Sequence, residues 1–220
     1  MINKYFFIGD DECQICKINK RLKGKKICSF CLKSLQIYNY YGKYEDLEEV
    51  LVACYYNDFI KEVVARYKFQ KETYLYNIFS DLMYDCLIQN IDPSLFTYII
   101  PIPCSKKTLR ERGFNCAGLL AEALADKLNM PYINPLIKDH TLEQNKIELR
   151  ERKINLKGKI RLNKSFSEDL RGKRVLLVDD IITTGSTLKE AEKVLNENSA
   201  SAIKILLASP SYHTITNSEV

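Results

Sequence analysis

Two adjacent carboxylates, Asp179 and Asp180, follow the apolar run 175–178 and precede a segment rich in hydroxyl side chains. The apolar run is typical of a buried strand in a parallel sheet, and ligands bind at the carboxyl ends of such strands. The aspartates are therefore placed to accept hydrogen bonds from the vicinal hydroxyls of a sugar. The hydroxyls, backbone N–H groups and glycine that follow form a nest for a 5-phosphate at the start of an amphipathic helix; they belong to Thr183, Thr184, Gly185, Ser186 and Thr187. The run predicts a phosphoribosyl diphosphate site.

A purely structural interpretation is that a parallel strand ends in acids and enters a helix through a Thr/Gly turn. It is disfavoured because two carboxylates without a basic neighbour are costly beside a phosphate nest unless a polyol or a metal lies between them. The chain contains neither G-x-x-x-x-G-K-[ST] nor G-x-G-x-x-G. These absences argue against an ATPase motor and a dinucleotide enzyme.

The anionic leaving group of such a ligand needs cations near a second strand end. A buried strand predicted at 98–102 runs into a turn with two lysines, followed by two arginines. The candidate diphosphate contacts are Ser105, Lys106, Lys107, Arg110 and Arg112. We expect Mg²⁺ to bridge the diphosphate and the acidic pair, with few protein ligands of its own. The polar segment 139–155, with Arg150 and Arg152, is predicted to be an arm that closes over the site.

Four cysteines form a second constellation near the amino terminus. Cys13 and Cys16 make one C-x-x-C pair, and Cys28 and Cys31 make another. This spacing lets two tight turns converge on one tetrahedral ion, so we predict a structural zinc in a small ribbon or knuckle. The alternative is two disulfides. It is disfavoured because the chain shows no secretory apolar region after Met1, which favours a reducing cytoplasmic location.

Composition is that of a soluble globular protein, with 46% hydrophobic and 28% charged residues in 220. The longest apolar stretches, such as 50–56 and 98–102, are too short to span a membrane as a helix. The net charge is +5, and Lys and Arg are concentrated between positions 138 and 174. This concentration suits a polyphosphate or nucleic-acid partner, although a solvated charged face is the commoner reason for a basic run.

The predicted elements place these motifs in an α/β chain. Strands are expected at 50–56, 98–102, 132–137, 161–167, 175–178 and 202–208, and helices at 58–67, 74–88, 117–128 and after Thr187. Segment 36–49 is predicted to be an acidic, tyrosine-rich connector. Strands alternating with helices from about residue 96 indicate a parallel sheet. We therefore predict a zinc-binding ribbon at 1–36, a connector with a strand and helices packing on the core at 37–95, and an α/β domain at 96–220. Because the loop from Asp179 to Thr187 resembles the signature of type I phosphoribosyltransferases, we expect this last domain to be phosphoribosyltransferase-like.

The order of these motifs resembles the ComF family of phosphoribosyltransferase-like competence proteins over nearly the whole chain. The family has glutamine where Cys116 stands and commonly arginine near His140. The matching segments are the two C-x-x-C pairs, Tyr67-Lys68-Phe69, Ile100-Pro101-Ile102-Pro103, Arg110-Glu111-Arg112-Gly113-Phe114-Asn115, then Thr141, Gln144, Arg152 and Asn155, and finally the loop from Asp179 to Thr187. The resemblance implies a type I phosphoribosyltransferase-like fold. It also implies a cytoplasmic role in DNA uptake during natural transformation, together with a helicase-like ATPase and proteins that process single-stranded DNA.

Two functions stay open at the level of sequence. The chain is either a phosphoribosyltransferase with an unknown acceptor, or a non-catalytic adaptor that binds single-stranded DNA and protein partners. Some purine enzymes with this loop have an aspartate where Thr183 stands, and a threonine cannot take over its proton transfer. A related hypothesis assigns DNA binding to the zinc module, whose lysines are interleaved with aromatic residues that stack bases: Phe30, Tyr38, Tyr40 and Tyr41.

Overall fold

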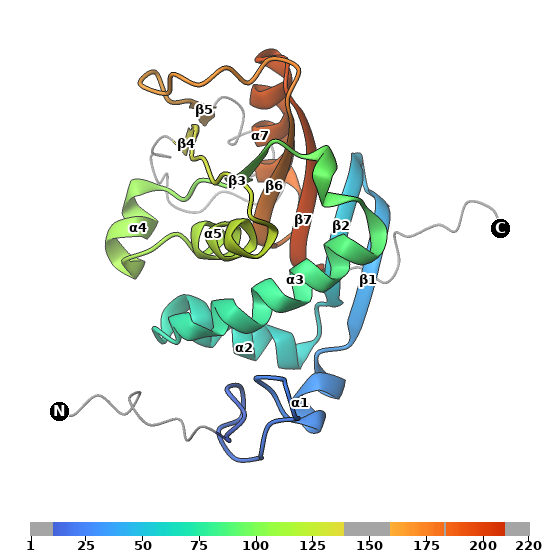
Figure 1. The fold of residues 1–220 in the computed structure, drawn as a ribbon. Coiled ribbons are helices and arrows are strands. Elements are labelled where there is room, and N and C mark those ends of the chain that lie inside the picture. Colours follow the sequence, from blue (N-terminus) through green and yellow to red (C-terminus); the bar gives the residue numbers. More distant parts are fainter. Residues whose placement is uncertain (1–10, 139–158, 183, 210–220) are drawn as a thin grey trace.

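A five-stranded sheet forms the centre of the molecule in the computed structural model, which describes residues 11–138, 159–182 and 184–209. Its strand order is β1-β2-β7-β6-β3, and only β1 runs antiparallel to its neighbour (Figure 1). The strands are β1 (Ile37–Tyr44), β2 (Leu47–Tyr55), β3 (Tyr98–Pro101), β6 (Arg174–Ile181) and β7 (Ser201–Ser209). The four parallel strands end at one edge of the sheet, where an α/β protein binds its ligands.

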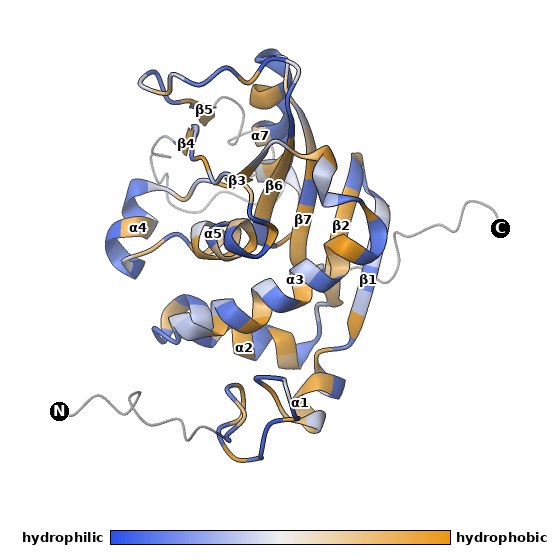
Figure 2. Cartoon of the chain, in the orientation of Figure 1, coloured by the Kyte–Doolittle hydropathy of each residue, from blue (hydrophilic) through white to orange (hydrophobic). Residues whose placement is uncertain are grey.

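Helices cover both faces of this sheet, so its central strands are apolar on both sides. In β6, Leu176 and Val178 face one hydrophobic cluster, whereas Val175 and Leu177 face the other. The first cluster contains α2 (Asp58–Phe69), α3 (Tyr76–Asn90) and α5 (Cys116–Leu128). The second contains α7 (Ser186–Glu197) and a two-stranded ribbon, β4 (Leu136–Lys138) with β5 (Ile160–Leu162). Figure 2 shows that hydrophobic and hydrophilic residues alternate along the helices, as expected for helices with one buried side.

The amino-terminal cysteine module lies below α2 and α3 in Figure 1 and ends in the short helix α1 (Ser29–Ser34). Its buried residues, among them Cys13, Ile15 and Leu35, belong to the same hydrophobic cluster as α2, α3 and α5. Lys26 adds an ion pair to Asp81 of α3 at 2.8 Å. The module therefore shares its core with the rest of the fold.

Most elements predicted from hydrophobic periodicity are confirmed, and four segments are corrected. The predicted connector 36–49 contains β1 and the start of β2, because Tyr38 and Tyr40 pack against the second cluster and give the segment a buried side. The turn expected after β3 contains a helix, α4 (Lys106–Arg112), since the Ser105 side chain caps it by accepting from Thr108 N at 3.0 Å.

The other two corrections concern strand length. In the predicted strand 132–137, Tyr132 makes only an isolated bridge to Ile99, and the ribbon strand starts at Leu136. The predicted strand 161–167 is reduced to β5, because the chain turns at Asn163, whose carbonyl accepts from Phe166 N. The arm predicted at 139–155 lies outside the described residues, and the domain boundaries stay predictions. Within the described part of the chain, none of the helices combines the length and apolar character needed to cross a bilayer.

Candidate functional site

Asp179 and Asp180 lie near the carboxyl end of β6, where the sheet meets a cleft of about 370 Å³. Each aspartate side chain accepts a hydrogen bond from the backbone of the next residue. Asp180 N donates to Asp179 Oδ1 at 2.9 Å, and Ile181 N donates to Asp180 Oδ1 at 2.7 Å. Burial, followed by the neighbouring charge of Asp180, raises the pKa of Asp179 to about 7. Two crowded carboxylates at the end of a parallel strand attract cations and hydrogen-bond donors such as sugar hydroxyls.

A lysine from a distant part of the chain partly neutralises this pair. Lys68 Nζ, at the end of α2, donates to Asp180 Oδ1 at 2.7 Å across 112 residues of sequence. The aspartates therefore do have a basic neighbour, contrary to the expectation from sequence, because Lys68 is distant along the chain and close only in the folded structure. The pair remains a candidate site, but it is already bridged to a cation of the protein.

The candidate phosphate loop joins β6 to α7. Gly185 caps α7 with a left-handed φ of 65°, and a Cβ placed on it would lie 3.0 Å from Leu47 Cδ1. The hydroxyls of Thr184 and Ser186 lie 2.9 Å apart and share a hydrogen bond. Thr187 lines the same cleft as the acidic pair. The loop therefore has a left-handed glycine and a helix N-terminus beside the carboxylates, as expected for a phosphate nest; Thr183 lies outside the described residues.

The structure brings only some of the predicted diphosphate contacts to the cleft. Ser105 and Arg112 line it, and Arg112 Nη1 donates to Cys116 Sγ at 3.1 Å. Lys106, Lys107 and Arg110 lie on α4 outside the described residues that line the cleft. Their roles in diphosphate binding stay predictions.

Four further polar residues that the sequence did not assign to the cleft also line it: Lys68, Thr108, Asn115 and Lys138. Lys68 belongs to a segment recognised only as a family motif, and Asn115 Nδ2 donates to Ile102 O at 3.0 Å. Lys138 stands at the end of β4, where burial lowers its pKa, and nearby Asp179 opposes the shift. Since the cleft holds Lys68, Arg112 and Lys138 beside two carboxylates, it is equipped for a ligand with both anionic groups and hydroxyls.

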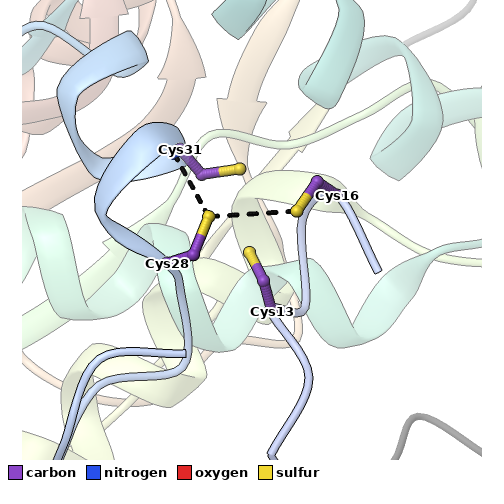
Figure 3. A group of neighbouring side chains, drawn as sticks. All are labelled: Cys13, Cys16, Cys28 and Cys31. Atoms are coloured by element: carbon purple, nitrogen blue, oxygen red, sulfur yellow. Dashed lines mark hydrogen bonds between the residues drawn. The ribbon is translucent and has the colours of Figure 1, made fainter. Parts of the chain in front are cut away.

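The four amino-terminal cysteines converge on one point, as Figure 3 shows. Their sulfur atoms all lie within 4.8 Å of one another, and Cys16 Sγ is 3.9 Å from Cys28 Sγ. Sulfurs around a tetrahedral zinc with Zn–S bonds of about 2.3 Å are separated by about 3.8 Å. A disulfide needs an S–S distance of about 2.0 Å. The geometry fits a metal ion, and all four cysteines are free thiols.

The electrostatics of the cysteine group favour a thiolate at Cys16. Burial opposes its ionisation, but hydrogen bonds from the backbone of Asn19 and Ile18 and from neighbouring thiols lower the pKa of Cys16 to about 7. The pKa of Cys28 is also lowered, because the backbone N–H and thiol of Cys31 donate to it against the effect of burial. The pKa of Cys31 is instead raised, first by burial and then by its hydrogen bonds with Cys13 and Cys28. Two of the four cysteines thus favour the thiolate that metal ligation requires, and the four sulfur donors fit a structural zinc.

The sequence of this chain is similar to those of several known proteins. The phosphoribosyl transferase domain family matches residues 109–209. Competence protein F of Haemophilus influenzae is 30% identical over 203 residues, covering 88% of this chain and 87% of the relative. Competence protein ComFC of Bacillus subtilis is 36% identical over 148 residues, covering 67% and 58% of the two chains. DNA utilization protein YhgH of Escherichia coli is 31% identical over 109 residues, covering 49% and 46%.

Solved structures include similar chains at low sequence identity. Adenine phosphoribosyltransferase from Thermoanaerobacter pseudethanolicus has a TM-score of 0.40 at 16% identity, covering 64% of this chain and 83% of that one. The Saccharomyces cerevisiae adenine phosphoribosyltransferase has a TM-score of 0.39 at 16% identity, covering 82% and 88%.

The mostly parallel sheet, the acidic pair ahead of the glycine loop and the family match define an α/β protein of the type I phosphoribosyltransferase fold class. The amino-terminal group of four cysteines is added to that fold. Since competence protein F matches over most of both chains, this chain belongs to the ComF family.

Proposed function

We propose that the cleft binds phosphoribosyl diphosphate together with Mg²⁺. The observation that carries the proposal is the position of Asp179 and Asp180, which share one cleft with Thr187 of the phosphate loop and with three basic side chains. A sugar with a phosphate at one end and a diphosphate at the other needs carboxylates in the middle and donors on both sides. The cleft is lined by groups of each of these kinds.

Each part of the ligand has a partner in this proposal. Asp179 and Asp180 accept from the ribose hydroxyls, while the loop with Thr184, Gly185, Ser186 and Thr187 holds the 5-phosphate. Ser105 and Arg112 face the diphosphate, and Lys106, Lys107 and Arg110 of α4 extend the positive surface next to it. Mg²⁺, when bound, would neutralise diphosphate charge as a hard, oxygen-seeking ion.

Isothermal titration with phosphoribosyl diphosphate and Mg²⁺ tests the binding. We expect saturable binding by the zinc-loaded protein and at least about a hundredfold loss in Asp179→Asn/Asp180→Asn, since two charged hydrogen bonds are removed. Glu122→Gln/Asp126→Asn removes two exposed acids from α5 and serves as the charge-matched control. Equal affinity in both double variants, or no binding by the wild-type protein at millimolar ligand, would reject the proposal.

A cleft that binds this ligand could belong to an enzyme or to a protein that senses the ligand. A turnover measurement distinguishes these two functions. Release of diphosphate when nucleobases are added to the loaded protein would make it a phosphoribosyltransferase. A saturated cleft without diphosphate release would make it a binding module that responds to the ligand.

We propose a role in DNA uptake for the whole protein. The support is the family itself, with relatives named competence protein and DNA utilization protein. In this role the four cysteines hold a structural zinc, and the protein acts in the cytoplasm with a helicase-like ATPase and with proteins that process single-stranded DNA. A deletion strain complemented by wild-type or Asp179→Asn/Asp180→Asn protein tests whether transformation frequency depends on the cleft.

A second candidate function, as an adaptor that binds single-stranded DNA, is favoured by the surface of the cysteine module. Phe30 is 63% exposed there, and segment 20–25 of the module exposes four basic side chains, which are Lys20, Arg21, Lys23 and Lys25. Tyr38 instead stacks on Tyr40 and Tyr55, with ring centroids 5.2 and 4.0 Å away. In this proposal the base-stacking role falls to Phe30 and to Tyr41, which is 38% exposed.

Fluorescence anisotropy with an oligothymidine strand tests this adaptor function. We expect Phe30→Ala to weaken binding about tenfold through lost base stacking. Replacing the four basic residues by glutamine should flatten the salt dependence of the affinity. Binding that keeps its affinity and salt dependence in both variants would place the DNA elsewhere on the protein.

A further inference from the structure

The end of helix α2 contacts four parts of the molecule through four consecutive side chains. Arg66 Nη2 donates to Ile15 O in the cysteine module at 2.7 Å, and Tyr67 Oη donates to Cys116 O at the start of α5 at 2.9 Å. Lys68 reaches Asp180, and the ring of Phe69 lies 5.0 Å from the Arg112 guanidinium carbon. The segment 66–69 is thus held on both sides of Lys68, which keeps the lysine side chain within reach of Asp180.

The Lys68–Asp180 pair is shielded from water more than a surface ion pair. The two side chains are only 20% and 10% exposed. Asp180 Oδ1 accepts from both Lys68 Nζ and the backbone N–H of Ile181. One carboxylate oxygen of the acidic pair is therefore occupied by the protein, in a position that a metal-bound water or a ribose hydroxyl would otherwise use.

We propose that Lys68 is the built-in counter-ion of the cleft, which keeps a bare divalent cation off the acidic pair and admits one that arrives with a diphosphate. The proposal deepens the proposed function and rests on it for the identity of the anionic ligand. It assigns a binding and positioning role to a side chain of α2, upstream of the matched phosphoribosyl transferase domain.

Charge balance explains this selectivity. A divalent ion prefers anionic oxygens, and the ammonium at Asp180 both occupies one of them and repels the incoming ion. A diphosphate brings negative charge of its own into a cleft that already contains Arg112 and Lys138. Lys68 can then turn from Asp180 to a diphosphate oxygen, so the metal and the ammonium no longer compete for the same carboxylate.

Two binding measurements on Lys68→Met test the proposal. Binding of Mn²⁺ alone is measured by electron paramagnetic resonance at pH 8. Mn²⁺ should bind to Lys68→Met about tenfold more tightly than to the wild-type protein, because the repelling charge is gone. Phosphoribosyl diphosphate with Mg²⁺, followed by titration calorimetry, should bind about tenfold more weakly, because one charged contact is lost. Lys68→Arg keeps the charge and should leave Mn²⁺ binding weak. Lys61→Met removes an exposed lysine from the same helix and should change neither affinity.

The opposite direction of the two shifts is the decisive result. If both affinities fall in Lys68→Met, the lysine is only a structural support and the proposal is wrong. Unchanged Mn²⁺ affinity also overturns it. If the wild-type protein does not bind phosphoribosyl diphosphate, the proposed function fails, whereas the Mn²⁺ measurement still decides whether Lys68 guards the acidic pair.

Discussion

Gly185 is the residue at which the backbone of the candidate phosphate loop is most constrained. Its φ of 65° is left-handed, and a Cβ there would press on Leu47 Cδ1 at 3.0 Å. We expect Gly185→Ala to lower the free energy of unfolding by about 1 kcal/mol or more and to weaken phosphoribosyl diphosphate binding at least about tenfold. Urea denaturation and titration calorimetry measure the two effects.

Gly172→Ala is the matched control for this prediction. Gly172 has a φ of 69°, but a Cβ there meets nothing within 4 Å, and it lies outside the residues that line the cleft. It should lose similar stability without losing ligand affinity. Equal ligand affinity in the two alanine variants would mean that the loop does not hold the 5-phosphate.

Among single residues, the sequence identified those candidates that belong to a short pattern of residues close together along the chain. The acidic pair, the left-handed glycine and the four cysteines each belong to a short pattern with fixed spacing. Lys68 did not, because its partner Asp180 is 112 residues away and only the fold brings them together. Lys138 was missed for the same reason, since its place in the cleft depends on the bridge that brings it beside Ser105.

At the scale of elements, Glu72 joins the cysteine module to the end of α2. It is 5% exposed, and its carboxylate accepts from Arg66 Nη2 at 2.6 Å, Lys17 Nζ at 2.8 Å and Tyr74 Oη at 2.8 Å. Burial alone would raise the pKa of Glu72, but these hydrogen bonds lower it below its ordinary value of 4.5. The native state therefore keeps the carboxylate ionised to lower pH than the unfolded chain does, and the resulting stability is lost as pH falls through the native pKa.

Glu72→Gln keeps the shape of the side chain and removes its charge. We expect it to cost roughly 3 kcal/mol at pH 7, because Arg66 is left partly buried without its anion. The difference from wild type should shrink as pH falls below 4.5 and the wild-type carboxyl also becomes neutral. Urea denaturation across this pH range measures both effects.

Glu48→Gln, which breaks an exposed pair with Lys43, is the control and should cost less than about 1 kcal/mol. A constant difference between Glu72→Gln and wild type over the whole pH range would show that the charge of Glu72 is not what stabilises this junction.

The elements that were mispredicted from the sequence lack a regular pattern of hydrophobic residues. β1 carries tyrosines and polar residues, with register shifts against β2 on both sides of its central pairs, so neither alternation nor a continuous apolar run marks it. α4 contains no buried residue, and its stability comes from the Ser105 cap and from the left-handed Gly113 at its end. By contrast, β6, β7 and α7 carry long apolar faces and were predicted correctly.

At the scale of the whole molecule, one hydrophobic cluster runs from the cysteine module through α2 and α3 to the sheet. Polar contacts follow the same route, from Ile15 O to Arg66 and onward along α2 to Lys68 in the cleft. A metal that orders the module therefore stabilises the support of the cleft as well. Linkage requires the binding free energy of the ion to add to the stability of everything that unfolds with its site.

Loss of the proposed zinc should accordingly lower the stability of the whole fold and the ligand affinity of the cleft, and not only the stability of the module. We expect Cys28→Ser/Cys31→Ser to lose stoichiometric zinc, to lower the Tm by at least about 5 °C in a single transition, and to weaken phosphoribosyl diphosphate binding because Lys68 is less well held. Elemental analysis, calorimetry and ligand titration measure the three effects. Cys54→Ser, at a buried cysteine outside the metal group, is the control and should keep zinc while losing some stability. Two separate thermal transitions, or full ligand affinity in the zinc-free protein, would mean that the module folds as an independent unit and that the end of α2 positions Lys68 without it.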